Sequence, residues 1–249
     1  MSARTDGVCQ GERMISSRRT TTTVVNAILV VLVGALVAGA CGDNSANPSP
    51  AGAGTNTLVG SVGELPEGCP AADGSAATKQ QFDGPPPFCL LQGQLYTATI
   101  TTNHGVVRAT LLPNIAPNTV NSFVYLARQH YFDTTTCHRA IRGFVVQCGD
   151  PTATGRGGPG YEFADELDKI SPYQIGSLAM ANSGPNTNGS QWFIVTGADG
   201  QQLDQNYTLF GQVIDDDVPI VAALDQLANP GDGPPLEPID IVSITITVS

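Results

Sequence analysis

The chain has 249 residues, of which 41% are hydrophobic, and this composition suits one or two globular domains. Its formal net charge is −11, from 11 Lys and Arg residues against 22 Asp and Glu residues. Because nucleic acid and anionic membrane surfaces attract basic patches, this acidic balance argues against either as an electrostatic partner.

The first 41 residues differ in composition from the rest of the chain. Arg13, Arg18 and Arg19 precede an apolar run at 24–40, and small residues stand before Cys41. This order is typical of a secretory leader, with Cys41 at the place where a bacterial lipoprotein carries its lipid. The alternatives are an uncleaved signal anchor, since the run is near the lower length limit for a spanning helix, and simple secretion. All three put the remainder outside the cytoplasm, and the first two hold it at the cell membrane.

Residues 42–93 are rich in Gly, Ala, Ser, Asn and Pro and show no apolar periodicity. This composition predicts a flexible tether, followed by a folded domain at 94–249. The second half of the tether contains Cys69 and Cys89, which a disulfide would close into a small loop.

Four cysteines remain when Cys9 and Cys41 of the leader are set aside: Cys69, Cys89, Cys137 and Cys148. An even number of cysteines in an exported chain suggests disulfides, and four cysteines allow three connectivities. No Cys or His grouping has the spacing of a metal site, and the three histidines are scattered. The sequence therefore predicts no bound metal.

The domain begins with patterned strands and alternates them with two helices. Alternating apolar residues predict strands at 95–101 and 106–112, joined by a turn at 102–105. Apolar residues at helical spacing, with Pro117 in the first turn, predict a helix at 116–130, and a second helix fits 218–228. Further strands are expected at 144–147, 177–181, 192–195, 207–213 and 239–249. Many short strands with two separated helices favour a mainly β fold, a closed antiparallel barrel with the helices outside it.

Two segments of the domain concentrate side chains suited to binding a peptide. "CHRAIRGFVVQCGD" at 137–150 brings Arg139, Phe144 and Gln147 onto a predicted strand–turn–strand. "MANSGPNTNGSQWFIVT" at 180–196 places Gln191 and Phe193 on one face of a strand, behind a loop rich in hydrogen-bonding groups. Taken singly, each residue has a plain interpretation: the phenylalanines as core, the arginine as a solvated surface charge.

Together these segments resemble the two signature segments of the cyclophilin-type peptidyl-prolyl cis/trans isomerases. "APNTVNSFVYLA", "GYEFADE" and "LDQNYTLFGQV" fall in that family's order and approximate spacing, and the resemblance covers residues 95–249. It implies a closed eight-stranded antiparallel barrel with two flanking helices, no cofactor, and proline-containing polypeptides as partners. Rotation about an X–Pro bond breaks no covalent bond, which agrees with the lack of a nucleophile and its base in the sequence.

The resemblance also implies roles for individual residues. Arg139 would be the catalytic residue, donating a hydrogen bond to the prolyl nitrogen as that atom becomes pyramidal. Gln147 would hold a substrate carbonyl, and the main chain of Asn182 the substrate backbone. The proline ring would enter an apolar pocket of Phe144, Val145, Phe193 and Leu203. Further positions that match family site residues are His138, Ala181, Gln191 and Tyr207.

Three positions depart from the family pattern. Gln202 stands where many members have a rim tryptophan, which makes tight cyclosporin binding doubtful, and Tyr207 stands in place of a histidine. Cys148 replaces a more usual glycine. If the strands on either side of residues 142–143 form a hairpin, Cys137 and Cys148 are expected to form a disulfide across it; two buried thiols are the alternative.

The sequence thus predicts an exported, membrane-held prolyl isomerase that helps exported proteins to fold. The alternative is a cyclophilin-like module at the cell surface that binds proline-containing segments with little turnover. The intact set of Arg139, Phe144, Gln147 and Phe193 favours the enzyme.

Overall fold

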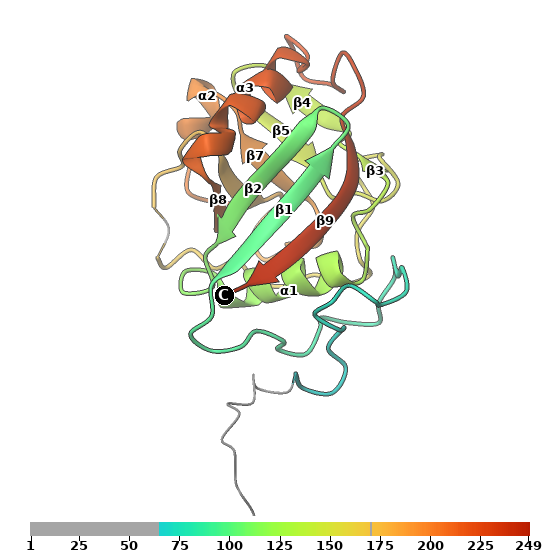
Figure 1. The fold of residues 1–249 in the computed structure, drawn as a ribbon. Helices are drawn as coiled ribbons and strands as arrows, with labels where there is room; N and C mark the ends of the chain where they lie inside the picture. Colours follow the sequence, from blue (N-terminus) through green and yellow to red (C-terminus); the bar gives the residue numbers. More distant parts are fainter. Residues whose placement is uncertain (1–64, 170) are drawn as a thin grey trace, which may run out of the picture. The chain divides into compact units, whose positions relative to one another are not determined.

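The computed structural model describes residues 65–169 and 171–249 (Figure 1). The predicted leader with Cys41 and the first part of the predicted tether, 42–64, lie outside the described residues. Within those two ranges, no helix is long and apolar enough to cross a bilayer.

One antiparallel sheet forms the framework of the described chain. Its strands are β1 (Tyr96–Thr102), β2 (Gly105–Leu111), β3 (Thr135–Thr136), β4 (Arg139–Ile141), β5 (Val145–Cys148), β6 (Ser177–Met180), β7 (Trp192–Val195), β8 (Leu209–Val213) and β9 (Asp240–Val248). Their order in the sheet is β3-β9-β1-β2-β8-β6-β7-β5-β4, and every neighbouring pair is antiparallel.

The sheet curls because its two edge strands follow one another in the chain. Only Cys137 and His138 separate the end of β3 from the start of β4, so both edges meet at this point. The prediction of a mainly β antiparallel barrel is confirmed, with a small difference in strand number. The sheet of the described residues has nine strands rather than eight, because the two-residue β3 pairs with the start of β9.

Two longer helices accompany the sheet, as predicted: α1 (Pro117–Arg128) and α3 (Val218–Gln226). Figure 1 shows them near opposite ends of the curled sheet. Pro117 opens α1, and the Glu166 carboxylate accepts hydrogen bonds from the backbone N–H groups of Asn118 and Thr119. This carboxylate satisfies donors that a helix N-terminus leaves unpaired. A short α2 (Ala198–Gln201) and a 3-10 turn, η1 (Asp215–Asp217), were not expected.

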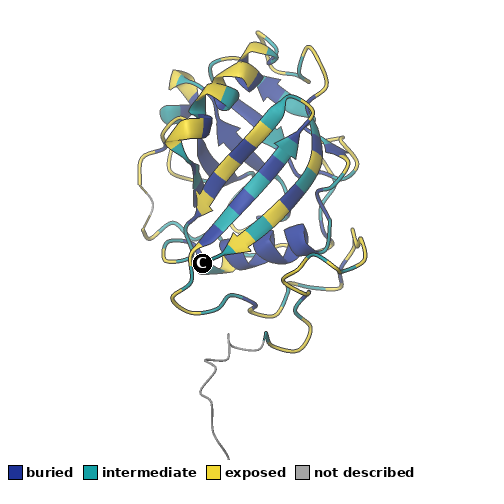
Figure 2. Cartoon of the chain, in the orientation of Figure 1, coloured by how far each residue is buried: buried dark blue, intermediate teal, exposed yellow. Residues whose placement is uncertain are grey.

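The strands differ in how many of their faces are buried. In β2, buried Val107, Ala109 and Leu111 alternate with exposed residues, so one face meets solvent (Figure 2). By contrast, all four residues of β6 and all four of β7 are buried. Trp192 and Ile194 of β7 enter the main core, whereas Phe193 and Val195 join a second, smaller apolar cluster on the opposite face. Antiparallel sheets commonly expose a polar second face, so this second apolar cluster is a distinct feature of the fold.

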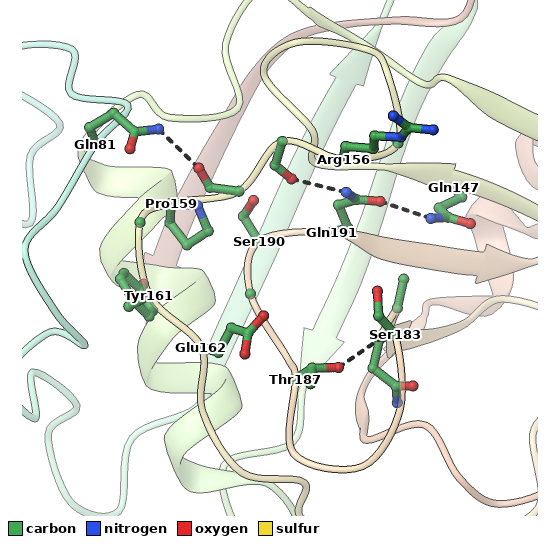
Figure 3. Close-up of a pocket in the computed structure, with 17 residues that line it drawn as sticks. Gln81, Gln147, Arg156, Pro159, Tyr161, Glu162, Ser183, Thr187, Ser190 and Gln191 are labelled. Atoms are coloured by element: carbon green, nitrogen blue, oxygen red, sulfur yellow. Dashed lines mark hydrogen bonds between the residues drawn. The ribbon is translucent and has the colours of Figure 1, made fainter.

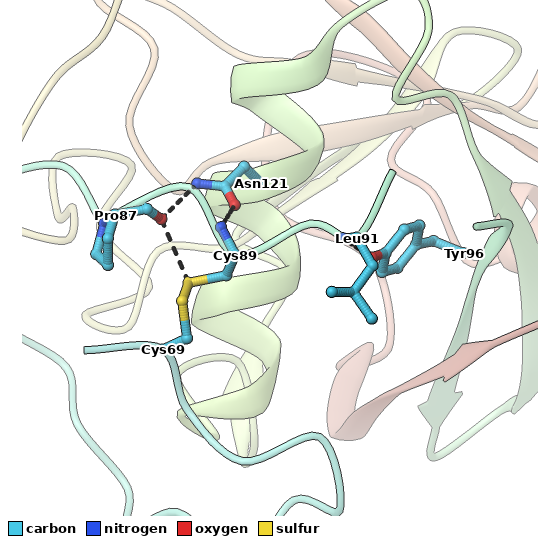
Figure 4. Close-up of a disulfide and its surroundings, with 6 residues drawn as sticks. All are labelled: Cys69, Pro87, Cys89, Leu91, Tyr96 and Asn121. Atoms are coloured by element: carbon cyan, nitrogen blue, oxygen red, sulfur yellow. Dashed lines mark hydrogen bonds between the residues drawn. A yellow bond between two sulfur atoms is a disulfide. The ribbon is translucent and has the colours of Figure 1, made fainter. Parts of the chain in front are cut away.

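Residues 65–93 pack against the domain, which differs from the flexible tether expected for them. Phe82 is buried, with its ring centroid 5.5 Å from that of Tyr125 in α1. The side chain of Asn121, also in α1, accepts a hydrogen bond from Cys89 N and donates one to Pro87 O, and Cys69 and Cys89 form a disulfide (Figure 4). One buried aromatic ring and one cross-link thus anchor a segment whose composition otherwise indicates disorder. We call residues 65–93 the N-terminal segment.

Candidate active site

A single row of paired residues crosses four strands on the face opposite the main core. Arg139 of β4 pairs with Gln147 of β5, Gln147 with Phe193 of β7, and Phe193 with Ala179 of β6. Directly paired residues of neighbouring strands point to the same face of a sheet. The backbone register therefore gathers a cation, an amide and an aromatic ring that lie 54 residues apart along the chain, from Arg139 to Phe193.

An apolar cluster lies beside this row. Its buried members are Val145, Tyr173, Ala179, Phe193, Val195 and Leu209, and Leu112, Phe144, Ala181, Leu203 and Tyr207 pack against them. The rings of Phe193 and Tyr207 meet edge to face, with centroids 5.5 Å apart. Phe144, Val145, Phe193 and Leu203, the four residues predicted to form a pocket for the proline ring, thus belong to one contiguous apolar surface. The departure at Tyr207 keeps an aromatic side chain in that surface.

The polar residues of the site form a chain of hydrogen bonds that all run in one direction. Arg139 Nη1 donates to Gln147 Oε1 at 3.4 Å, Gln147 Nε2 donates to Gln191 Oε1 at 2.9 Å, and Gln191 Nε2 donates to Gly157 O at 2.9 Å. Figure 3 shows the last two bonds. Because a guanidinium only donates and a carbonyl only accepts, the two ends of this chain fix the orientation of both amide groups. The rim of the apolar cluster is therefore rigidly linked to the loop at 155–160.

The guanidinium of Arg139 is also held by an acid that the sequence analysis did not identify. Arg139 Nε donates to Asp232 Oδ1 at 2.7 Å and Nη2 to Asp232 Oδ2 at 3.2 Å, while the guanidinium carbon lies 5.9 Å from the centroid of the Phe144 ring. The hydrogen bonds from Arg139 hold the pKa of Asp232 below its usual value. Asp232 lies 93 residues from Arg139, in a Pro- and Gly-rich loop, and no local pattern marks it.

The β4–β5 hairpin that carries Arg139 is fixed at both ends. At the turn, Gly143 has a positive φ of 75°, and its N–H donates to Asp225 Oδ1 of α3 at 2.8 Å. A side chain at Gly197 would collide with the Gly143 backbone, so the close approach of these two loops requires glycine there. At the open end, Cys137 and Cys148 form a disulfide.

A groove of about 860 Å³ adjoins the apolar cluster. Four of the predicted site residues line it: Gln147, Ala181, Asn182 and Gln191. Its other walls come from the loop at 155–162, from the loop at 183–190, and from Gln81 of the N-terminal segment. Gln81 Nε2 donates to Gly158 O at 3.0 Å (Figure 3). The N-terminal segment therefore completes one wall of the groove.

Side-chain hydrogen bonds brace the loop at 181–190. Asn182 Nδ2 donates to Asn206 O at 3.0 Å, and Thr187 Oγ1 accepts from Ser183 N and donates to Gly184 O. Among the described residues, no hydrogen bond uses the main-chain N–H or carbonyl of Asn182. These two groups border the groove and remain available to the backbone of a bound peptide.

Asp150 organises the loop on the other side of the groove. Its carboxylate accepts hydrogen bonds from the backbone N–H groups of Thr152, Thr154 and Gly157. Burial alone would raise its pKa, but the hydrogen bonds from Thr152 and from the loop backbone outweigh burial and lower the pKa to about 2. The loop therefore keeps its charged anchor throughout the neutral pH range.

His138 is the predicted site residue that the structure does not bring into the row, the apolar cluster or the groove. It is next to Arg139 in the chain, just before β4 begins. Its ring lies against Gly155, whose Cβ position is 3.3 Å from His138 Cδ2, and burial lowers its pKa. A position behind the loop suits a packing role better than contact with a peptide.

Comparison with known proteins identifies the same family. Residues 97–246 match the family model described as "Cyclophilin type peptidyl-prolyl cis-trans isomerase/CLD". The chain is 44% identical over 171 residues to "Peptidyl-prolyl cis-trans isomerase A" of Mycobacterium tuberculosis, covering 61% of this chain and 92% of that protein. It is 40% identical over 188 residues to "Putative peptidyl-prolyl cis-trans isomerase" of Staphylococcus aureus, covering 63% of this chain and 93% of the relative.

A solved structure shares the fold. The crystal structure of a Cryptosporidium parvum cyclophilin type peptidyl-prolyl cis-trans isomerase is similar at a TM-score of 0.57 and 34% identity, over 61% of this chain and 98% of that one. The resemblance seen in the two sequence segments is thus confirmed over most of the domain. This chain belongs to the cyclophilin-type peptidyl-prolyl cis/trans isomerases and is a prolyl isomerase by family.

Proposed function

We propose that this prolyl isomerase acts on exported proteins at the outer side of the cell membrane, with Arg139 as its catalytic residue. The observation that carries the assignment of the site is the row in which Arg139, Gln147 and Phe193 share one face beside the apolar cluster. The row combines a water-poor surface for the proline ring with a fixed cation at its edge.

The barrier to rotation comes from amide resonance and is about 20 kcal/mol. Resonance weakens as the bond twists, and the prolyl nitrogen regains a lone pair. A donor aimed at this lone pair binds the twisted form more strongly than the planar form, which is the requirement for catalysis. Arg139 supplies the donor, and its guanidinium also contacts Gln147 and the ring of Phe144. Seating the proline on apolar residues removes water that would stabilise the planar, charge-separated amide.

The groove provides room for residues next to the X–Pro bond. The Gln147 side chain and the free main-chain groups of Asn182 would bind the peptide backbone, and loops 155–162 and 183–190 would contact the neighbouring side chains. Consistent with such a site, a structural neighbour from Cryptosporidium parvum was crystallised in the presence of the dipeptide Ala-Pro. Cyclosporin binding would be weak because Gln202 replaces a tryptophan at the rim.

A peptide titration followed by NMR tests this placement. Adding an Ala-Pro-containing tetrapeptide to the purified chain should shift the backbone signals of Phe193, Leu203, Gln147 and Asn182 in a saturable manner. Shifts confined to residues away from the row and the groove would exclude this site.

The export part of the proposal is supported by the leader sequence ending at Cys41 and by the two disulfides, Cys69–Cys89 and Cys137–Cys148. Stable disulfides form mainly in oxidising compartments outside the cytoplasm. In cell fractionation, the wild-type chain should be found with membranes, and Cys41→Ser should lose its lipid label. A wild-type chain found only in the cytoplasm with free thiols would refute membrane-held export.

A further inference from the structure

The loop that follows α3 covers the free edge of β4. Residues 229–233 of this loop run beside the edge strand and exchange three backbone hydrogen bonds with it: Asn229 N to Ala140 O, Arg142 N to Asn229 O, and Ala140 N to Gly233 O, each 2.9 Å long. The loop thus takes the place that a further strand would occupy. Its position is set by the same strand that carries Arg139.

The loop is also braced internally. Asn229 Oδ1 accepts a hydrogen bond from Gly231 N at 2.9 Å, and Asn229 Nδ2 donates to Pro234 O at 3.3 Å. Asp232 lies between these fixed points, so its carboxylate is presented by a restrained backbone although its side chain is 70% exposed. The bracing explains how an exposed acid can hold a defined orientation.

Asp232 binds one side of the Arg139 guanidinium with two hydrogen bonds, to Nε and Nη2. Gln147 accepts from Nη1 on another side. A guanidinium has five N–H donors, so these three bonds leave one N–H on each terminal nitrogen. With the Nε side occupied, the remaining donors point in fixed directions.

We propose that Asp232 is a positioning residue for catalysis: it holds the Arg139 guanidinium so that a terminal N–H is directed at the prolyl nitrogen of the bound peptide. This inference rests on the proposed role of Arg139. Arg139 has a long, flexible side chain on an edge strand, and its side chain is 31% exposed. Without the carboxylate it would sample several rotamers, and the donor would have to be reoriented at the moment of reaction.

The charges near the pair do not provide a substitute. Among the described residues, the Arg139 side chain makes hydrogen bonds only to Asp232 and to Gln147, and Gln147 carries no charge. Asp232 is exposed, so replacing its carboxylate does not leave an unpaired polar group in the protein interior. Asp232 variants are therefore expected to fold.

The test compares Asp232→Asn, Asp232→Glu and the control Glu237→Gln in the full chain. The control removes the same charge from an exposed residue of the following segment. Asp232→Asn should lower kcat about 10-fold and change KM less than about twofold, because positioning acts on the transition state. Asp232→Glu, which restores the carboxylate, should recover part of the loss, and Glu237→Gln should behave as wild type.

A second measurement reports on position directly. The ¹⁵N–¹H signal of Arg139 Nε should exchange slowly with water in the wild type and fast in Asp232→Asn. A double variant completes the set: in an Arg139→Ala background, Asp232→Asn should cause no further loss of residual activity, because Asp232 acts only through Arg139.

The outcomes separate this inference from the proposed function. An unchanged or higher kcat in Asp232→Asn, together with a large loss in Arg139→Ala, would overturn the role of Asp232 and keep that of Arg139. Full activity in Arg139→Ala would overturn both. An equal effect of Asp232→Asn in both backgrounds would also overturn the positioning role, since the carboxylate would then act without the arginine.

Discussion

Gln147 and Gln191 are joined by a hydrogen bond of 2.9 Å, from Gln147 Nε2 to Gln191 Oε1, and this bond connects the two halves of the site. On one side Gln147 pairs with Arg139 at the edge of the apolar cluster; on the other, Gln191 donates to the groove loop at Gly157. The orientation of the Gln147 amide beside Arg139 therefore depends on the Gln191 amide, which the groove loop holds.

Breaking this chain at its centre should reduce catalysis. Gln147→Ala removes one contact to Arg139 and one to Gln191, and we expect kcat/KM to fall about 10-fold, which corresponds to about 1.4 kcal/mol. Steady-state kinetics with a proline tetrapeptide measures the change. Gln226→Ala, at the exposed end of α3, serves as the control. Wild-type kinetics in Gln147→Ala would show that the chain of hydrogen bonds has no catalytic importance.

Truncating the centre of the apolar cluster should weaken both binding and folding. Phe193 is only 4% exposed and packs edge to face on Tyr207. Phe193→Ala should cost about 3 kcal/mol of unfolding free energy and raise KM, since it removes the main apolar contact proposed for the proline ring. Phe193→Leu retains most of the apolar volume, so urea denaturation and KM should both change less. If KM stays constant in the alanine variant, the proline ring binds elsewhere.

The two disulfides should differ in their effect on turnover. Replacing Cys137 and Cys148 by alanine should loosen the hairpin that carries Arg139, lowering stability by about 3 kcal/mol and lowering kcat as well. Replacing Cys69 and Cys89 should expose the N-terminal segment to proteases while kcat on a short peptide is kept, because among the described residues that segment makes no hydrogen bond to the Arg139 side chain and does not belong to the apolar cluster. Limited proteolysis and kinetics of the two double variants distinguish these outcomes. Equal losses of kcat in the two double variants would contradict the prediction that only the Cys137–Cys148 disulfide affects turnover.

The docking of the N-terminal segment should depend on pH through His130. Both ring nitrogens face acceptors: Nδ1 lies 2.7 Å from Asp133 Oδ2 and Nε2 lies 2.7 Å from Gly74 O. Only the protonated imidazole can donate to both. The hydrogen bond to the Gly74 carbonyl has the larger effect and the one to the Asp133 side chain the smaller, and together they raise the pKa of His130 above its ordinary value of 6.5.

Because the pKa of His130 is raised by folding, its contribution to stability is complete below the ordinary value and is lost as pH rises through the raised pKa. The difference in Tm between wild type and His130→Gln should therefore be largest near about pH 5 and disappear toward about pH 9. A difference that grows with pH would show that the neutral ring is the form favoured by folding.

Much of this fold could be predicted from the sequence because its signals are local. The alternation in β1 and β2, the helical spacing after Pro117, and the two motif segments predicted the sheet, the helices and the family. Two features could not be predicted in this way. β3 has only two residues and exists because β9 pairs with it, and Phe82 is a single aromatic residue in a Gly- and Pro-rich stretch.

The site residues also divide into those marked by a local sequence pattern and those placed by contacts between distant segments. Residues within the two motifs, such as Phe144 and Gln191, were predicted because these motifs resemble the signature segments of the cyclophilin family. Asp232 could not be found from sequence spacing, because its contact with Arg139 depends on how the loop after α3 folds back along β4. His138 was assigned from its place in the motif, but it lies before β4 begins and its ring lies against Gly155.

The most direct test of the account is the rate of proline isomerisation by the full chain, wild type beside Arg139→Ala, in a protease-coupled assay. The account predicts rapid turnover by the wild type and a loss of at least about 100-fold in kcat/KM in the variant, equivalent to about 2.7 kcal/mol of transition-state stabilisation. Both proteins should show the same Tm. A correctly folded Arg139→Ala variant with wild-type turnover would contradict the catalytic role of Arg139, and a folded wild type without turnover would make this chain a proline-binding module.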